Sequence, residues 1–234
     1  MTAALAGQGL TRAYGGFRAL DAVDLSVEGG QIRGLIGPNG AGKSTLIDVL
    51  SGRARNWSGR IFLRGEEVTG LGVQQRRRRG LARSFQRTNV FAGISVAQQL
   101  AVAARALGSE GLEEVIEALS LAPLLERRAQ EISYGDQRRL DLALALVGRP
   151  QVLLLDEPAA GLTVEESLQL AAILRDLVKR WEVTVLLVEH DMEVIFSVCD
   201  RITVLHLGRV LAEGPPDAVR ADPQVIAAYL GSQA

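Results

Sequence analysis

Residues 32–50, IRGLIGPNGAGKSTLIDVL, decide the fold of this chain. The segment opens with an apolar run typical of a buried strand and closes with apolar residues at helical spacing. Between them, residues 37–45 read GPNGAGKST and match the pattern G-x-x-x-x-G-K-[ST], which needs a strand before it and a helix after it. The segment therefore predicts a strand, a glycine-rich loop and a helix, a unit that binds the phosphates of a nucleoside triphosphate.

Each residue type in this loop suits the binding of phosphate. Glycines allow backbone N–H groups to wrap around phosphates, because they lack a Cβ and adopt conformations that other residues avoid. The compact charge of Lys43 neutralises the β- and γ-phosphates, and the hydroxyl of Ser44 can bind Mg²⁺. We expect the whole loop to surround the phosphates, namely Gly37, Pro38, Asn39, Gly40, Ala41, Gly42, Lys43, Ser44 and Thr45.

The composition predicts a single soluble domain with a substantial core. The chain has 234 residues, of which 47% are hydrophobic, and its formal net charge is −1, so there is no electrostatic reason to expect a nucleic-acid partner. No apolar run approaches the roughly 18–20 residues that cross a bilayer, and the N-terminus lacks a signal-peptide pattern. The single cysteine, Cys199, predicts a buried thiol in a reducing compartment. We therefore expect a cytoplasmic protein that meets a membrane only through partners.

Apolar periodicity divides the rest of the chain into strands and helices. Strand and helix patterns alternate, which predicts an α/β fold with a largely parallel sheet and helices on both faces. Residues 87–131 show helical spacing without strand signals, and we interpret them as a helical insertion. The other expected helices are 42–53, 136–147, 164–180, 191–199 and 222–231, and the expected strands lie within 9–37, 58–68, 151–157, 183–190 and 201–214.

Two features that could suggest function are interpreted as structural. Residues 76–79 are four consecutive arginines, but no aromatic residues are interleaved with them and the chain is nearly neutral. We therefore expect a solvated surface helix there instead of a basic binding patch. His206 lies within the late strand pair, and we expect a structural role for it.

Two further buried strands end in polar residues. Residues 152–158, VLLLDEP, place Asp156 and Glu157 at the carboxyl edge of the sheet, where ligands of such folds bind. Asp156 can hold Mg²⁺ through water, and Glu157 can polarise the attacking water. Residues 183–191, VTVLLVEHD, end similarly, and His190 can contact the γ-phosphate and orient the same water. Catalysis at such a site is mostly positioning and charge stabilisation.

Residues 132–140, ISYGDQRRL, begin a helix, and their role is open at this point. Ser133 can cap the helix, and Asp136 stands at the spacing of a capping box. Helix starts also attract anions, because unpaired N–H groups and the helix dipole point outward there. The same residues therefore suit either a structural cap or a phosphate site.

The ordered motifs resemble those of the ATP-binding cassette (ABC) ATPase subunits of membrane transporters. The resemblance rests on the phosphate loop, Gln86, ISYGD, LLLDEP, AAGLT and EHD, and it covers essentially the whole chain. The segments ARSFQ, SYGDQRRL, DEPAAGL, VEHDMEVI, CDRI and YLG are most similar to the branch that energises branched-chain amino acid uptake. The resemblance implies a P-loop NTPase (RecA-like) core, an N-terminal antiparallel β part and a helical subdomain. It places the core at about 1–86 and 140–234 and the helical subdomain at about 87–139.

The resemblance also implies roles for individual residues. Two subunits, identical or different, would sandwich ATP between the phosphate loop of one and residues Ser133, Tyr134 and Gly135 of the other. Tyr14 would stack on adenine, and residues 159–163 would lie across the dimer interface. The implied catalytic residues are Lys43, Gln86, Glu157 and His190, and the implied Mg²⁺ ligands are Ser44, Gln86 and Asp156.

The implied partners are permease subunits, which would hold the protein at the inner face of the membrane, and indirectly a solute-binding protein. Gln86 would transmit nucleotide binding to the permeases through the helical insertion. The same motifs leave open a lipopolysaccharide-type exporter and a soluble ABC protein acting on ribosomes or DNA.

The chain departs from the family pattern at three places. Asp136 stands where glutamine is usual, and Thr163 stands where aspartate or asparagine is usual. The helical insertion also looks short around residues 100–120. Asp136 would oppose a second anion at the helix start, so we expect this subunit to close on ATP less readily than a glutamine version.

Overall fold

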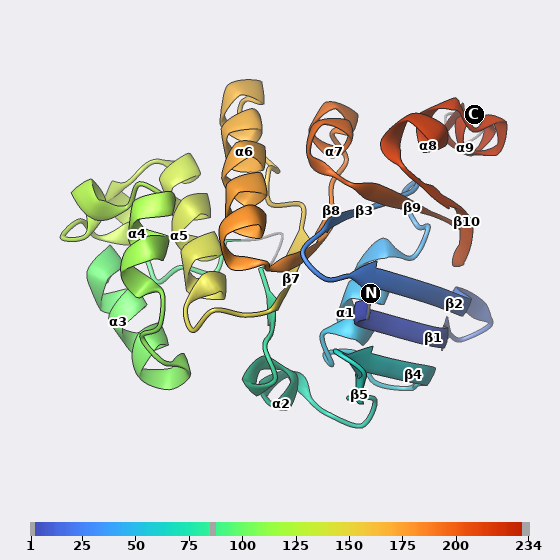
Figure 1. The fold of residues 1–234 in the computed structure, drawn as a ribbon, viewed down its shortest axis with the longest axis horizontal. Coiled ribbons are helices and arrows are strands. Elements are labelled where there is room, and N and C mark those ends of the chain that lie inside the picture. The colour runs from blue at the N-terminus through green and yellow to red at the C-terminus, as the bar shows by residue number, and fades with distance from the viewer. Residues whose placement is uncertain (1–2, 85–87, 231–234) are drawn as a thin grey trace.

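The computed structural model describes residues 3–84 and 88–230. A central sheet has the strand order β10-β9-β3-β8-β7-β6 (Figure 1). Its neighbouring strands are parallel except for β10, which runs antiparallel to β9. The strands are β3 (Ile32–Ile36), β6 (Leu81–Arg83), β7 (Val152–Asp156), β8 (Thr184–Val188), β9 (Arg201–His206) and β10 (Arg209–Gly214).

The register of the sheet brings the ends of three strands together. In the parallel ladders Leu35 of β3 and Asp156 of β7 both pair with Val188 of β8. The glycine-rich loop, the acids after β7 and residues 189–190 after β8 therefore emerge side by side at one edge. This is the edge at which ligands bind in open α/β sheets.

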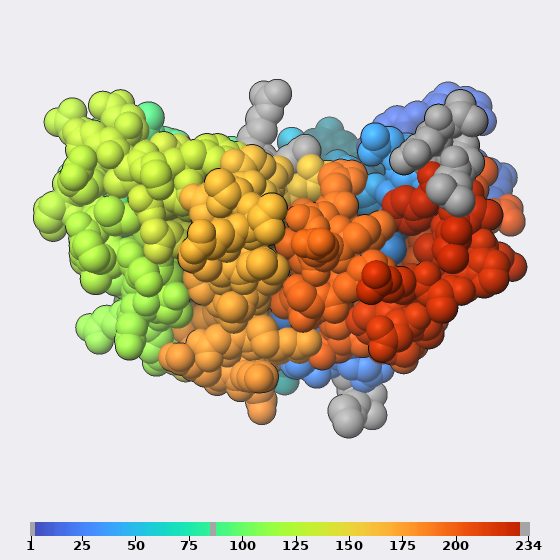
Figure 2. Space-filling model, turned by 90° about the horizontal axis from the view of Figure 1, so that it is seen from above, coloured from blue at the N-terminus to red at the C-terminus, as the bar shows by residue number. Residues whose placement is uncertain are grey.

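Both faces of the central sheet are buried, as its continuous apolar strands predict. Alternate residues of β7 point to opposite faces, so Leu153 and Leu155 join one core cluster and Leu154 joins another. The first face is covered by α5 (Tyr134–Leu146), α6 (Val164–Trp181) and α7 (Met192–Val198), and the surface formed by α6 and α7 is seen in Figure 2. Cys199 is buried against this face, which raises the pKa of its thiol to about 12.

The second face of the central sheet packs against a helix and an antiparallel sheet. Helix α1 (Lys43–Leu50) buries Leu46, Ile47 and Leu50 in the same cluster as the apolar side chains of the N-terminal strands. The antiparallel sheet has the order β2-β1-β4-β5, formed by β1 (Ala3–Tyr14), β2 (Phe17–Glu28), β4 (Trp57–Leu63) and β5 (Glu66–Glu67). This arrangement confirms the expected α/β core with an N-terminal antiparallel part.

The helical insertion lies at one end of the molecule (Figure 1). It contains α3 (Val96–Leu107), α4 (Leu112–Ala118) and two 3₁₀ turns, Ala122–Leu124 and Ala129–Glu131. Its buried residues Val96, Leu100 and Val115 belong to the same cluster as the sheet residues Leu153 and Leu155. Helix α5 continues across the expected boundary at residues 139 and 140 without a break, and the division into core and helical subdomain stays a prediction.

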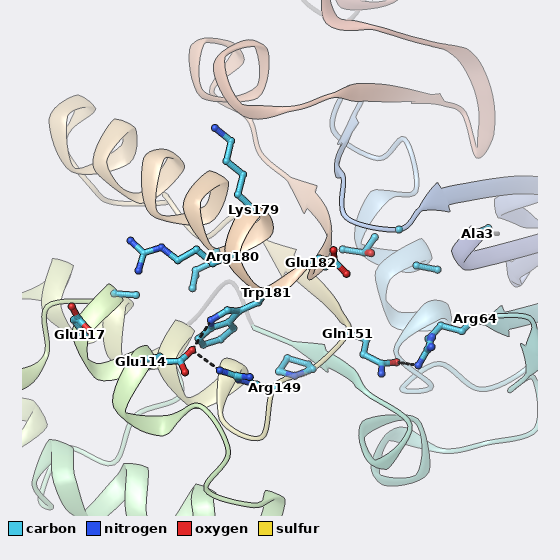
Figure 3. A pocket seen from close by; sticks show the side chains of 16 residues that line it. Ala3, Arg64, Glu114, Glu117, Arg149, Gln151, Lys179, Arg180, Trp181 and Glu182 are labelled. Carbon is cyan, nitrogen blue, oxygen red and sulfur yellow. Dashed lines mark hydrogen bonds and ion pairs between the residues drawn. The ribbon is translucent and has the colours of Figure 1, made fainter. Parts of the chain in front are cut away.

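A hollow of about 990 Å³ marks the joint between the helical insertion and the core (Figure 3). Here Glu114 of α4 accepts hydrogen bonds from Trp181 Nε1 at 2.9 Å and from Arg149 at 2.5 Å. Trp181 and Thr184 lie at the amino end of β8, so this hollow is at the sheet edge opposite the glycine-rich loop. It is a joint between the two parts of the chain, remote from the predicted phosphate site.

The four consecutive arginines are less exposed than the sequence predicts. Helix α2 (Val73–Arg78) is present, but Arg76 is only 1% exposed. Its guanidinium donates to the carbonyls of Val49 and Leu50 at 2.8 and 2.7 Å, which caps the C-terminus of α1. Arg77 donates to the carbonyls of Ala145 and Val147 at the end of α5. The expectation of a solvated helix face was therefore wrong for two of the four residues, because the guanidiniums of Arg76 and Arg77 donate hydrogen bonds to carbonyls at the ends of α1 and α5.

Most of the remaining predicted elements are present. The C-terminal part contains α8 (Pro216–Ala221), which the sequence did not indicate, and the expected final helix, α9 (Pro223–Leu230). The short strand β6 was also missed, since three residues are too few to show a period. In the part of the chain that the structure describes, we find no helix that combines the length and apolar character needed to cross a membrane.

Candidate nucleotide-binding site

The glycine-rich loop connects β3 to α1, as the sequence predicts, and two glycines are required by close approach. Gly37 has a φ of 155°, and a Cβ there would lie 2.1 Å from the carbonyl oxygen of Leu205 in β9. Gly42 has a φ of 108°, and a Cβ there would lie 2.4 Å from the carbonyl oxygen of Ala19 in β2. The neighbouring strands therefore hold the loop tightly, and its backbone is shaped before any ligand arrives.

Lys43, the first residue of α1, is folded back onto this loop. It is 7% exposed, and its Nζ donates to the carbonyl oxygens of Gly37 and Pro38 at 2.5 and 3.0 Å. Burial lowers the pKa of Lys43, while the nearby carboxylates of Glu157 and Asp156 oppose that change. The positive charge of Lys43 is thus buried beside the loop, where a phosphate would be a stronger hydrogen-bond partner than neutral carbonyls.

Asp156, the last residue of β7, is 6% exposed and forms an ion pair with an arginine. Arg83 at the end of β6 lies 3.0 Å from the Asp156 carboxylate and 2.5 Å from that of Asp48 in α1. Burial raises the pKa of Asp156, and the charge of Arg83 acts in the opposite direction. Arg83 therefore orients the residue that the sequence assigns to Mg²⁺, a role that sequence reasoning missed.

Glu157 and His190 belong to motifs 33 residues apart, and the structure joins them. His190 Nε2 lies 2.5 Å from Glu157 Oε1. Glu157 has a left-handed φ of 53°, which costs a non-glycine residue about 1–2 kcal/mol. Its backbone N–H donates to the carbonyl of Val188 at 2.9 Å, which holds that conformation. The backbone is therefore strained at the residue that is expected to polarise the attacking water.

Glu189 supports the same corner of the site and was also missed. It is 5% exposed, and its carboxylate accepts hydrogen bonds from the N–H groups of Ala159 at 2.7 Å and His190 at 3.3 Å. Burial raises the pKa of Glu189, and the two backbone donors counter that effect. Glu189 thus ties the segment after β7 to the segment after β8.

Tyr14, at the end of β1, is 51% exposed and available for stacking. The guanidinium of Arg12 lies 4.5 Å from the centre of its ring. This is a cation–π contact on one ring face. Adenine stacking on Tyr14 stays a prediction, and it would use the other face or displace Arg12.

At the start of α5, the hydroxyl of Ser133 serves as both acceptor and donor. It accepts a hydrogen bond from the Asp136 N–H at 3.1 Å and donates to the Asp136 carboxylate at 2.8 Å. Arg139 forms an ion pair with the same carboxylate. The expected reciprocal cap is therefore only half formed, because Asp136 accepts from the Ser133 hydroxyl where a capping box accepts from the backbone N–H.

Tyr134 and Gly135 pack against the loop after β7. Tyr134 donates from its hydroxyl to the carbonyl of Ala160 at 3.2 Å, and a Cβ on Gly135 would lie 2.8 Å from Glu166 Oε1. Thr163, one of the departures from the family pattern, caps α6 in a full capping box with Glu166. Residues 159–163 are thus braced against the helix start of the same chain.

The structure assembles one half of the predicted site and keeps the other half separate. Lys43, Asp156, Glu157 and His190 meet at the carboxyl edge of the central sheet. Ser133 and Gly135 line a different hollow of about 360 Å³ between α5 and α6, and within residues 3–84 and 88–230 the glycine-rich loop forms no part of its wall. Gln86, assigned to Mg²⁺ and the attacking water, lies outside the described residues.

Some of these missed residues carry weak sequence signals. Arg83 stands three residues before Gln86 in ARSFQ, and Glu189 stands directly before His190. The sequence does not show that Arg83 pairs with Asp156 or that Glu189 accepts a hydrogen bond from Ala159, since these partners are distant along the chain. The sequence signal that could have drawn attention to them is a charged residue at the end of an apolar strand, a place where it becomes buried.

Known families and relatives are similar to this chain over most of its length. Residues 20–160 match the family model for ABC transporters, and residues 209–234 match a model described as branched-chain amino acid ATP-binding cassette transporter. The chain is 38% identical to the high-affinity branched-chain amino acid transport ATP-binding protein BraF of Pseudomonas aeruginosa, with 95% of this chain and 96% of that protein covered. The chain is also 38% identical to the high-affinity branched-chain amino acid transport ATP-binding protein LivG of Escherichia coli K12, with the same shares of both chains covered.

A solved structure agrees with the sequence comparisons. The fold resembles the ADP conformation of an ATP-binding cassette of an ABC transporter, with a TM-score of 0.91 and 27% identity. The similarity covers 99% of this chain and all of that one. The chain therefore belongs to the ABC transporter family, as an ATP-binding and ATP-hydrolysing subunit.

Proposed function

We propose that this chain energises the import of branched-chain amino acids through permease subunits in the membrane. The observation that carries the proposal is its 38% identity, over nearly the full length of both proteins, to BraF and LivG. The second family model, at residues 209–234, points to the same branch. In this arrangement the protein is cytoplasmic and held at the inner face of the membrane by the permeases.

The geometry supports ATP hydrolysis with Mg²⁺. Ser44 supplies a hydroxyl and Asp156 a buried carboxylate, which are the oxygen ligands that Mg²⁺ accepts beside phosphates and water. Mg²⁺, when bound, neutralises charge that develops on the phosphates. Lys43 leaves the carbonyls of Gly37 and Pro38 to hold the phosphates. Glu157, oriented by His190, takes the proton of the attacking water.

The separation of Ser133 and Gly135 from the phosphate loop supports a dimer. These residues complete a site only if they face the phosphate loop of a second subunit, identical or different. Residues 159–163 join the two halves, because they begin two residues after Glu157 and brace Tyr134 through Ala160. Closure of the two subunits on ATP would then drive the permeases, which receive solute from a solute-binding protein.

Purification from the native host tests the proposed partners and solute class. We expect a tagged chain to bring down permease subunits and a solute-binding protein. The ATPase activity of the reconstituted complex should rise when the binding protein carries leucine, isoleucine or valine. A complex that lacks permeases, or a binding protein whose branched-chain ligands leave the activity unchanged, contradicts the proposal.

Asp136→Gln should strengthen ATP-driven dimerisation by about 2- to 5-fold, because it removes a carboxylate that repels a second anion at the start of α5. In the present chain the Asp136 carboxylate accepts a hydrogen bond from the Ser133 hydroxyl and forms an ion pair with Arg139. Dimerisation is measured by light scattering against ATP concentration, in a Glu157→Gln background that prevents turnover. Asp136→Asn removes the same charge without lengthening the side chain, and it should also strengthen ATP-driven dimerisation. Equal or weaker closure in Asp136→Gln refutes the hypothesis.

A further inference from the structure

Arg138 is a buried arginine in the second turn of α5, four residues after Tyr134. It is 5% exposed, and its Nε donates a hydrogen bond to the hydroxyl of Tyr134 at 3.0 Å. Its Nη2 donates at 3.0 Å to the backbone carbonyl of Ala160, which also accepts from the Tyr134 hydroxyl at 3.2 Å. Arg138, Tyr134 and Ala160 are therefore joined to one another pairwise.

These contacts give Tyr134 a fixed place although its side chain is close to the surface. Tyr134 is 44% exposed, and an exposed side chain that is held in one rotamer loses conformational entropy. The guanidinium of Arg138 lies 5.3 Å from the centre of its ring, which adds a cation–π contact. A Cβ on Gly161 would lie 2.9 Å from the ring atom Cε1, so the glycine lets the ring lie close to the backbone. Arg138 thus holds Tyr134 against residues 159–163.

A buried acid holds the same segment by its other polar group. The N–H of Ala159 donates to the Glu189 carboxylate at 2.7 Å, one residue before the carbonyl that Arg138 binds. Glu189 is 5% exposed and directly precedes His190. Two adjacent residues of the segment are therefore fixed by buried side chains of opposite charge, one on α5 and one beside His190.

We propose that Arg138 is a positioning residue that fixes the start of α5 relative to residues 159–163, so that a second subunit meets both as one preformed surface. The inference rests on the proposed dimer, in which Ser133 and Gly135 serve the ATP of the partner. Arg138 acts on closure, because groups that are already ordered lose less conformational entropy when two subunits associate. The planar fork of arginine suits this task, since it holds two acceptors in one fixed geometry, which the ammonium of lysine does not.

Arg138→Lys tests this role, because lysine keeps the positive charge and loses the fork. In a Glu157→Gln background that prevents turnover, we expect the subunit concentration for half-maximal dimerisation with ATP to rise about 3- to 10-fold, the usual value of one hydrogen bond. The Kd of the separate subunit for ATP should not change, because the phosphate loop makes none of the contacts described for Arg138. Dimerisation is measured by light scattering, and Kd by calorimetry at a subunit concentration below that of dimerisation.

Tyr134→Phe is a second variant that keeps the ring beside Gly161 and removes only the hydroxyl shared with Arg138 and Ala160. It should also weaken ATP-driven dimerisation. Adding it to Arg138→Lys should weaken dimerisation less than the two separate effects combined, because residues that act as a unit are not additive. If Arg138→Lys fails to fold, Tyr134→Phe decides, since its side chain is partly exposed and its ring is kept.

Arg33→Lys is the matched control. Arg33 of β3 is also buried, at 2% exposed, and its guanidinium likewise donates to a hydroxyl and to a backbone carbonyl. These partners are Thr203 at 3.2 Å and Ser26 at 2.9 Å, and Glu213 forms an ion pair with Arg33 at 2.7 Å. They belong to β9, β2 and β10 and not to α5 or residues 159–163, so Arg33→Lys should leave dimerisation unchanged.

The outcomes separate this role from a purely structural one. Unchanged dimerisation in Arg138→Lys, with or without a lower midpoint of thermal unfolding, overturns the proposal. An equal loss of dimerisation in Arg33→Lys also overturns it, because any buried arginine would then have the same effect. If the chain with Arg138 intact fails to dimerise on ATP in the Glu157→Gln background, the proposed dimer is wrong, and this inference fails with it.

Discussion

Glu157→Gln is expected to bind ATP as tightly as the unchanged protein and to hydrolyse it about 10²- to 10⁴-fold more slowly, the usual contribution of a general base. Glutamine keeps the length of the side chain and an oxygen that His190 Nε2 can still contact at the position seen 2.5 Å away. It cannot take a proton from water. ATP should therefore accumulate in a closed dimer of the variant, because closure needs binding and reopening needs hydrolysis.

Three measurements check this expectation. Steady-state phosphate release gives the rate, calorimetry gives the affinity for ATP, and light scattering gives the fraction of dimer. Glu66→Gln, on exposed β5, is the matched control, and its rate should equal that of the unchanged protein. If Glu157→Gln hydrolysed ATP at the unchanged rate, Glu157 would not be the group that takes the proton of the attacking water.

Lys43→Ala is expected to weaken ATP binding by at least about 30-fold. Loss of one partner from a buried, hydrogen-bonded charge pair costs about 2–5 kcal/mol, and the γ- and β-phosphates would lose their principal cation. In the absence of nucleotide, Lys43 is buried, its hydrogen bonds go to two neutral carbonyls, and its charge is also influenced by the nearby carboxylates of Glu157 and Asp156. Its removal should therefore change the free energy of unfolding far less than the affinity.

The chain contains one other lysine, which makes a precise comparison possible. Lys179 lies exposed on α6, and Lys179→Ala should bind ATP normally. Lys43→Arg should behave like Lys43→Ala, because the broad guanidinium does not fit a space in which the ammonium is 7% exposed. Both affinities can be followed through the rise in unfolding temperature with ATP. Tight ATP binding by Lys43→Ala would refute the interpretation of residues 37–45.

Local patterns were enough to predict most of the fold. The glycine-rich loop and the buried strands ending in Asp156 and His190 each lie within about ten residues, and the apolar periods that identify them are local properties. They predict a parallel sheet whose carboxyl edge carries the site. The same reasoning failed for Arg76, because its carbonyl partners at Val49 and Leu50 lie more than twenty residues away.

The sequence by itself predicted which residues carry phosphate chemistry, and it determined on which ends of strands they stand. Only the tertiary structure decided how they are paired: Glu157 with His190, and Asp156 with Arg83. The physical reason is that these pairs depend on the order and register of strands that are far apart in the chain. A one-dimensional pattern records the period of each element, whereas contacts between elements arise when the core packs.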